Sequence, residues 1–318
     1  CRLTKSLHAY QFRVDGHSSH TFGPNFGAAA AAGALAGVSA TQARYLLSYA
    51  AQQASGVACW MRDKDHIEKA FDFGGMPARN GVSAAVMVIN GFTGVEDVFS
   101  GERNFYDAYG VNPIRGALGE DLGSRYEIMR TSIKRWTVGS PIQAPLDSLD
   151  TLMHESSLAT QIDQIKRIKI LIPHESLSIV NNREMPEICL QHLVALMLVE
   201  GAMSFELAHD RSRMHDPRVL ALRALVDLEG SDELSKFMPT RQGIAEVELT
   251  SGQILRAYTR DVKGTPDNPM TRQELERKCV QLMAPILGRE RSEALCALIW
   301  QLERLDKASD LTRLLVPN

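Results

Sequence analysis

The stretch Ile168-Lys-Ile-Leu-Ile-Pro173 decides the fold class of this 318-residue chain. It alternates in polarity over a short run and then meets a proline, which is typical of a β-strand with one half-exposed face. Farther along, Ser251-Gly252 separates Glu246-Val-Glu-Leu249 from Ile254–Thr259, and this arrangement predicts a β-hairpin. Between these strands, helices are expected at 187–202 and 215–226.

Sequence typical of helices surrounds this α/β segment. Residues 25–60 include an Ala-rich run, and Ser39-Ala-Thr-Gln42 has the pattern of a capping box, in which two side chains satisfy backbone N–H groups at a helix start. Residues 76–92 form a second apolar stretch with helical character. Thr271-Arg-Gln-Glu274 predicts another capping box near the end of the chain. A final helix is indicated by apolar residues at helical spacing, namely Leu295, Leu298, Ile299, Leu302 and Leu305.

The order helical, α/β, helical predicts a mainly α fold with an inserted α+β domain. An all-helical domain made of residues 1–131 and 270–318 is therefore expected, with the inserted domain, which the family resemblance below identifies as a lid domain, at 132–269. Residues 104–123 are mixed in character and are expected to form short helices and turns.

Composition excludes several classes of protein. The 44% hydrophobic content is too high for a disordered chain, and 38 acidic against 35 basic residues lack the basic excess typical of nucleic-acid binding. No window holds the 18 or so apolar residues that cross a bilayer, and no secretory signal opens the chain. The five cysteines are scattered, which favours free thiols in a reducing compartment. We therefore expect a cytoplasmic protein without a membrane or nucleic-acid partner.

The common cofactor signatures are missing from the chain. It has no GxGxxG motif after a strand, no GxxxxGK[ST], no HExxH and no GxSxG. His17-Ser-Ser-His20 supplies only half of a zinc site. No metal is therefore expected, and the chemistry must come from ordinary side chains or from a cofactor without a local signature.

The histidine pair is the first candidate for chemistry. His17 and His20 precede Gly23 and Gly27, which open the Ala-rich helix. Imidazoles beside a helix N-terminus suit proton transfer and anion binding. The structural alternative is a polar loop in which one histidine caps the helix.

The second candidate is the stretch from Lys69 to Gly81. It is apolar enough to be buried, yet it carries Lys69, Asp72, Arg79 and Asn80. Buried charges without partners are costly, so these groups are either paired or face a polar cleft. A structural pair of Asp72 with Arg79 is the alternative.

The third candidate is the junction where the α/β segment begins. Lys134 and Arg135 are adjacent cations there, and Gln143 follows shortly after. Arginine can bind a carboxylate through two parallel hydrogen bonds, so the junction suits an acidic substrate. The alternative is a solvated junction in which Trp136 is a packing anchor.

Taken in order, these segments resemble the MmgE/PrpD family, which includes 2-methylcitrate dehydratases, cis-aconitate decarboxylases and iminodisuccinate epimerases. Each block is weak alone, but their order and spacing together are specific over nearly the whole chain. The blocks are His17…Phe22-Gly-Pro-Asn-Phe-Gly-Ala-Ala-Ala-Ala-Ala32, Ala54-Ser-Gly56, Lys69…Gly75-Met-Pro-Ala-Arg-Asn-Gly81, Gly91-Phe-Thr-Gly94, Lys134-Arg-Trp136, Asn268-Pro-Met270 and Leu287-Gly288.

The resemblance implies a helical domain with an inserted lid, a homodimer, and an enzyme without an organic cofactor. It implies acid/base chemistry next to a carboxylate of a small di- or tricarboxylate. A cofactor-independent hydro-lyase is expected first, with decarboxylation and epimerisation as alternatives.

The resemblance also assigns roles to residues. His17 matches the family histidine with an offset of one residue, which leaves His20 as a competitor. Lys69 matches a family lysine with the same offset, and Lys134 matches the lysine that begins the lid. The expected catalytic residues are His17, Lys69 and Lys134, and the expected substrate-binding residues are His20, Arg79, Arg135 and Gln143.

Some positions depart from the family pattern. Phe73 stands where a family histidine is usual, and Gly139-Ser-Pro-Ile-Gln143 replaces histidines that often follow the lid lysine. A further N-terminal helical segment of the family is expected to be missing. These departures identify a divergent branch and keep open a second class of function, a non-catalytic homologue that binds carboxylates.

Overall fold

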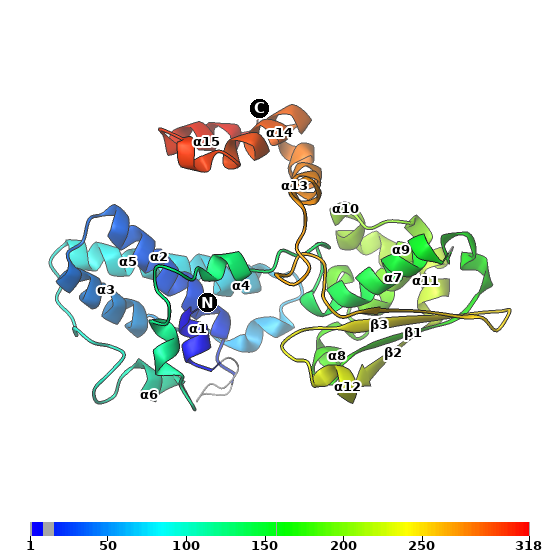
Figure 1. Ribbon diagram of the computed structural model, residues 1–318, viewed down its shortest axis with the longest axis horizontal. Helices are drawn as coiled ribbons and strands as arrows, with labels where there is room; N and C mark the ends of the chain where they lie inside the picture. The colour runs from blue at the N-terminus through cyan, green and yellow to red at the C-terminus, as the bar shows by residue number, and fades with distance from the viewer. Residues whose placement is uncertain (1, 9–15, 157, 318) are drawn as a thin grey trace. The chain divides into compact units, whose positions relative to one another are not determined.

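The computed structural model describes residues 2–8, 16–156 and 158–317. Contacts between residues divide the chain into two compact units, Cys1–Ile128 and Met129–Asn318, which are described separately below as unit 1 and unit 2. The described part is mainly helical with one small sheet, as expected (Figure 1). The expected grouping of 270–318 with the N-terminal helices stays a prediction.

In unit 1, small residues allow two helices, α2 (Phe22–Leu35) and α5 (Met76–Ile89), to pack closely against each other. α2 crosses α5 at Gly81, where an added Cβ would lie 2.3 Å from the backbone oxygen of Asn25. Only glycine permits that approach, because any side chain would push the helices apart. The remaining helices of unit 1 are α1 (Arg2–Ser6), α3 (Ala40–Gln52), α4 (Ile67–Ala70), the π-helical turn η3 (Phe71–Gly75), α6 (Phe105–Tyr109) and the 3-10 turns η1 (Ser19–Thr21), η2 (Ala58–Arg62) and η4 (Arg115–Leu118).

Both predicted capping boxes are confirmed. At the start of α3, the Ser39 side chain accepts from the Gln42 N–H and the Gln42 side chain accepts from the Ser39 N–H. Thr271 and Glu274 make the same reciprocal pair at the start of α13 (Arg272–Leu287). The local sequence therefore fixes where these two helices begin.

Unit 2 contains a four-stranded mixed sheet in the order β2-β1-β3-β4. The predicted strand is β1 (Ile165–Pro173), and the predicted hairpin is β3 (Gly243–Leu249) with β4 (Ile254–Thr259). β3 pairs antiparallel with both β1 and β4. β2 (Val226–Ser231) pairs parallel with β1 and was not predicted. Only its first residue is buried, so it lacks the alternating pattern that marks a strand in sequence.

Helices cover both faces of this sheet. α7 (Gln143–Glu155) and α9 (Leu190–Glu200) lie on one face, and α8 (His174–Val180) and α12 (Asp232–Ser235) lie on the other (Figure 1). The apolar side chains of β1 and α9 fill the core between the layers. The other two helices of this part are α10 (Phe205–His209) and α11 (Pro217–Arg223).

The end of the chain differs from the single final helix that the apolar spacing predicts. α14 (Arg289–Ile299) ends before Leu302 and Leu305, and α15 (Ala308–Leu314) follows. Leu302 is 56% exposed, so no burial of its side chain holds the helix together past Ile299. The prediction was wrong for these two leucines.

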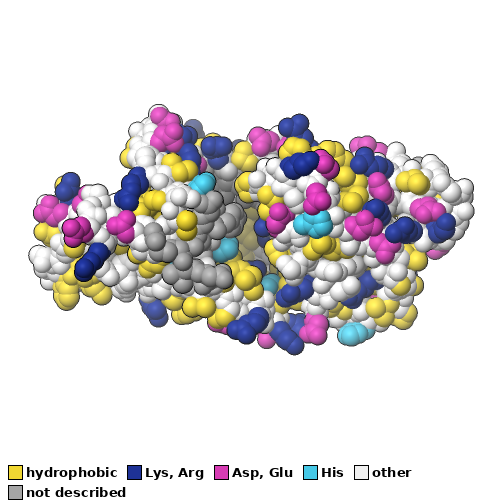
Figure 2. Space-filling view, turned by 90° about the horizontal axis from the view of Figure 1, so that it is seen from below, with side chains coloured by type: hydrophobic (Ala, Val, Ile, Leu, Met, Phe, Trp, Pro, Cys, Tyr) yellow, Lys and Arg dark blue, Asp and Glu magenta, His cyan; other side chains and the backbone are white. Residues whose placement is uncertain are grey.

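None of the helices in the described ranges is long and apolar enough to span a membrane. Acidic and basic side chains are interspersed on the face of the molecule that Figure 2 displays. This mixture matches the near-neutral formal charge of −3.

Candidate functional site

In unit 1, His17 lies at the edge of an aromatic cluster. Its ring is 5.1 Å from that of Phe22 and 5.3 Å from that of Tyr109. Its Nδ1 lies 3.1 Å from the backbone oxygen of Ser18. A carbonyl oxygen can only accept, so this contact places the proton on Nδ1 and makes Nε2 the basic nitrogen of the neutral ring.

His20 and Lys69 meet the same two aromatic rings. The His20 ring stacks on Phe73 at 4.0 Å and meets Trp60 edge-on at 5.7 Å. The Lys69 ammonium lies 5.6 Å from the Phe73 centroid and 5.7 Å from the Trp60 centroid. Both cation–π distances are within the range of attraction, so the Trp60 and Phe73 rings help to position the Lys69 ammonium.

The buried carboxylate of Asp72 is connected to Trp60 through the Ser18 hydroxyl. Asp72 is 5% exposed and accepts a hydrogen bond from the Ser18 hydroxyl, which also accepts from the Trp60 indole at 3.3 Å. Gly56, with a φ of +132°, passes so close that an added Cβ would lie 2.7 Å from the Asp72 carboxylate. Asp72 belongs to the π-helical turn η3, an irregularity that is frequent at functional sites.

Arg79 does not pair with Asp72 in the described structure, so the structural alternative for this stretch was wrong. Its guanidinium lies 5.9 Å from the Phe71 ring and donates to the Asn80 side chain at 3.2 Å. Asn80 in turn donates to the backbone oxygen of Gln53. Arg79 is exposed on the first turns of α5, where it contacts Phe71 and does not belong to the Asp72 network.

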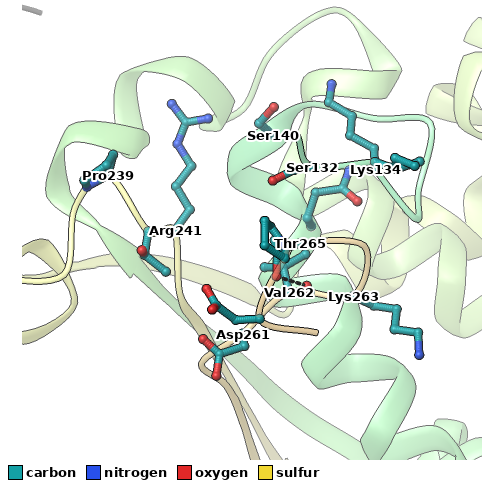
Figure 3. Close-up of a pocket in the computed structure, with 14 residues that line it drawn as sticks. Ser132, Lys134, Ser140, Pro239, Arg241, Asp261, Val262, Lys263 and Thr265 are labelled. Carbon is teal, nitrogen blue, oxygen red and sulfur yellow. Dashed lines mark hydrogen bonds between the residues drawn. The ribbon is translucent and has the colours of Figure 1, made fainter. Parts of the chain in front are cut away.

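In unit 2, Lys134 lies on a pocket of about 320 Å³ (Figure 3). Its ammonium donates to the backbone oxygen of Val138 at 2.9 Å. Gly264, with a φ of +95°, holds the segment before Lys134 in place, because its carbonyl oxygen accepts a 2.7 Å hydrogen bond from the Ile133 N–H. The pocket is lined by Ser132, Ile133, Lys134, Ser140, Gln143, Pro239, Thr240, Arg241, Asp261, Val262, Lys263, Thr265, Pro266 and Asp267.

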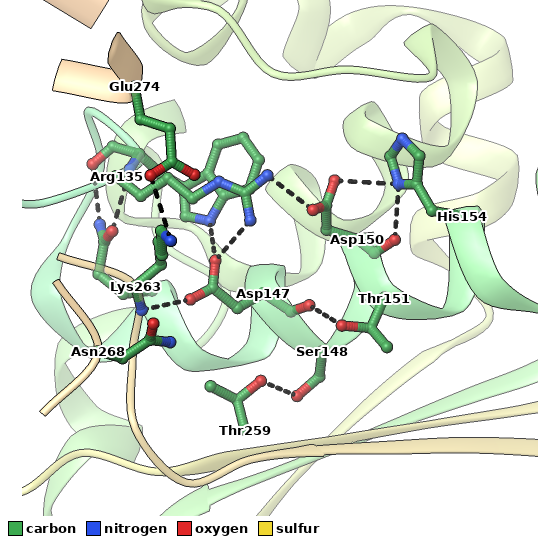
Figure 4. Close-up of polar contacts among 12 residues, drawn as sticks. Arg135, Asp147, Ser148, Asp150, Thr151, His154, Thr259, Lys263, Asn268 and Glu274 are labelled. Carbon is green, nitrogen blue, oxygen red and sulfur yellow. Dashed lines mark hydrogen bonds and ion pairs between the residues drawn. The ribbon is translucent and has the colours of Figure 1, made fainter. Parts of the chain in front are cut away.

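Arg135 is engaged by the protein itself, although it was expected to bind substrate. Its guanidinium pairs with Asp147 at 3.2 Å and with Asp150 at 2.7 Å, and it stacks on Trp136 at 4.1 Å (Figure 4). Asp147 also accepts from the Trp136 indole and from the backbone N–H of Lys263. Burial raises the pKa of Asp147, and these donors oppose that rise.

Gln143 is also used internally. It is 4% exposed, accepts from the backbone N–H of Trp136 at 3.1 Å and donates to the Trp136 oxygen at 2.9 Å. Trp136 is 9% exposed and belongs to the main hydrophobic core. The packing role of Trp136 is therefore confirmed, and Gln143 shapes the pocket wall while both ends of its amide contact backbone.

Each unit contains residues that sequence analysis did not select. Trp60 and Ser18 complete the unit 1 cluster, and Arg241 and Asp261 line the unit 2 pocket. Ser18 lies between the two predicted histidines, whereas Trp60, Arg241 and Asp261 belong to no recognisable motif and are brought to these positions by the fold. Within the described ranges, no three His, Cys, Asp or Glu side chains are grouped so that they could hold a metal ion.

Comparison with known proteins identifies both parts of the chain. The family model for the MmgE/PrpD C-terminal domain matches residues 136–303, and the model for the MmgE/PrpD N-terminal domain matches residues 1–114. The expectation that the N-terminal segment is missing is therefore not supported. No curated protein matches the sequence. With one family model covering more than half of its length, the chain belongs to the MmgE/PrpD family.

Proposed function

We propose that this protein is a cofactor-independent hydro-lyase acting on a small di- or tricarboxylate. The family is largely enzymatic and includes dehydratases and decarboxylases. The observation that carries the proposal is the placement of Lys69 and His20 against the same two aromatic rings, Trp60 and Phe73, of which Phe73 shares the π-helical turn η3 with buried Asp72. Cations beside an imidazole suit a carboxylate substrate and proton transfer.

His17 is the proposed acid/base residue. Its contact with the Ser18 oxygen leaves Nε2 as the basic nitrogen, which can remove a proton from the carbon next to a carboxylate. The electron pair of that C–H bond becomes the new C=C bond, and the hydroxyl on the adjacent carbon leaves as water after it takes up a proton. Lys69 in unit 1 and Lys134 in unit 2 are each proposed as a cation that stabilises negative charge on a substrate carboxylate. His20, Arg79, Arg135 and Gln143 are secondary candidates for substrate contacts.

The test is turnover by the full chain with citrate, 2-methylcitrate and their unsaturated products, followed by the ultraviolet absorbance of the conjugated double bond. We expect His17→Ala, Lys69→Ala and Lys134→Ala each to lower kcat/KM roughly 10²–10⁴-fold. Lys166→Ala is the matched control, because Lys166 pairs with Glu248 on the exposed surface of the sheet. An unchanged kcat and KM for Lys134→Ala would remove Lys134 from the mechanism.

A non-catalytic carboxylate-binding protein is the second candidate. It is favoured by the internal use of Arg135 and Gln143, whose side chains hold Asp147 and Trp136. Binding of these acids without turnover would support this reading, and turnover would remove it. Release of CO2 or epimerisation of an aspartate-like acid would instead indicate one of the other family reactions.

A further inference from the structure

We propose that Arg241 binds a carboxylate group of the ligand in the unit 2 pocket. Arg241 lines this pocket together with Lys134, and its side chain is partly buried. The proposal takes the ligand class from the proposed function and adds a residue for its recognition. It is argued from unit 2 alone.

Among the described residues, the guanidinium of Arg241 has no hydrogen-bond acceptor and no carboxylate in an ion pair with it, and its Nε is buried. Withdrawing a charged donor from water without a partner costs free energy. A carboxylate in the pocket would supply the missing acceptor, and the planar guanidinium can hold it through two hydrogen bonds.

The backbone on the C-terminal side of Arg241 is fixed in place. Gln242 is 2% exposed and accepts a hydrogen bond from the Tyr258 hydroxyl. Gly243 packs so closely on the start of α7 that an added Cβ would lie 2.7 Å from a side-chain carbon of Pro145. The Gly243 oxygen also accepts from the Ser148 hydroxyl at 3.1 Å. The backbone next to Arg241 is therefore rigid, and a rigid backbone lowers the entropic cost of binding a ligand.

Charges in the pocket are separated by sign. In Figure 3, the Arg241 guanidinium and the Lys134 ammonium lie toward one side, and the Asp261 carboxylate lies toward the other. Asp267 is a second acidic residue of the lining, and the Lys263 ammonium is paired with Glu274 at 3.2 Å. A ligand carboxylate is attracted to the side of Arg241 and repelled by Asp261.

The experiment is calorimetric titration of the full chain with citrate at low ionic strength. We expect Arg241→Gln to weaken citrate binding about tenfold or more, because a charge-assisted pair is lost. Arg241→Lys should recover part of the affinity, since lysine keeps the charge but not the two-point geometry. Asp261→Asn should tighten binding by removing repulsion.

Arg256→Gln is the matched control. It removes the same charge from β4, where Arg256 pairs with Glu246 outside the pocket lining, and it should change affinity less than about twofold. Equal binding by Arg241→Gln and Arg256→Gln, or no citrate binding by the unaltered chain, overturns the assignment. Equal, Arg241-dependent binding of inorganic phosphate overturns the carboxylate class.

These outcomes separate the assignment from the proposed function. Citrate binding that depends on Arg241 in a chain without turnover supports the assignment and counts against the lyase. Turnover together with binding that ignores Arg241 supports the lyase and removes the assignment.

Discussion

Arg135 and Arg241 are both partly buried arginines of unit 2, but their surroundings differ. Arg135 meets two carboxylates and an indole ring, and its main partner Asp147 receives two more hydrogen bonds (Figure 4). Arg241 faces a pocket and has a buried Nε for which the described residues provide no acceptor (Figure 3).

The difference separates a structural cation from a binding cation. A guanidinium saturated by the protein stabilises the fold and has little left to offer a ligand. A guanidinium left without acceptors beside a cavity is paired only when a ligand arrives. In both cases it is the neighbouring residues that set the role of the side chain.

The largest expected effect on stability is that of removing Asp147, the carboxylate that accepts from Arg135, Trp136 and Lys263. Asp147→Ala leaves Arg135, the Trp136 indole and the Lys263 N–H without their shared acceptor, so we expect it to lower the free energy of unfolding by about 3 kcal/mol or more. Urea denaturation followed by circular dichroism measures this loss.

A matched variant controls for the loss of an acidic residue. Asp227→Ala breaks the pair with Arg167, in which both side chains are 53% exposed, and should cost less than about 1 kcal/mol. Equal costs for the two variants would show that the cluster around Asp147 is no more important than a surface pair.

Local signals in the sequence predicted much of the fold but less of the site. The capping boxes depend on residues three apart, and β1 and the hairpin depend on short alternating runs, so each could be found without tertiary information. β2 was missed because it is held by its pairing with β1.

The roles of the polar residues depend on distant partners. Arg135 and Lys134 are adjacent in sequence, yet one is bound to α7 and the other lines the pocket. Arg241 is 107 positions beyond Lys134 and follows no motif, so only the fold brings it to the pocket. The family resemblance marked Lys134 as a candidate catalytic residue, but it gave no indication that Arg241 lines the same pocket.

His192, like Arg241, is a buried polar side chain without a hydrogen-bond partner among the described residues, but it does not line the unit 2 pocket. His192 is fully buried on α9, and neither ring nitrogen has a hydrogen-bond partner among the described residues. Burial, with the charges of Arg223 and Arg213 adding to it, lowers the pKa of His192 from 6.5 to about 4. The folded protein therefore keeps this ring neutral above about pH 4, and the ring does not line the unit 2 pocket.

The pH dependence of stability follows from that lowered pKa. Between about pH 6.5 and 4 the unfolded chain takes up a proton that folded His192 does not, so the unfolding free energy falls as pH falls. The full shift corresponds to at most about 3 kcal/mol. Urea denaturation across this range should show a smaller slope for His192→Leu, and equal slopes would contradict the assignment to His192.

The smallest expected effect on stability is that of replacing Gln143, and it tests whether this side chain holds the fold or contacts substrate. Because its amide joins both backbone groups of Trp136, Gln143→Ala should lower the free energy of unfolding by about 1–2 kcal/mol. Exposed Gln253→Ala, on the turn of the hairpin, should change it by less than about 0.5 kcal/mol. If Gln143 also contacted substrate, its variant would weaken citrate binding as strongly as Arg241→Gln. We expect instead a loss of stability with citrate affinity changed less than about threefold, because the amide is already saturated by backbone groups whereas the guanidinium of Arg241 is not.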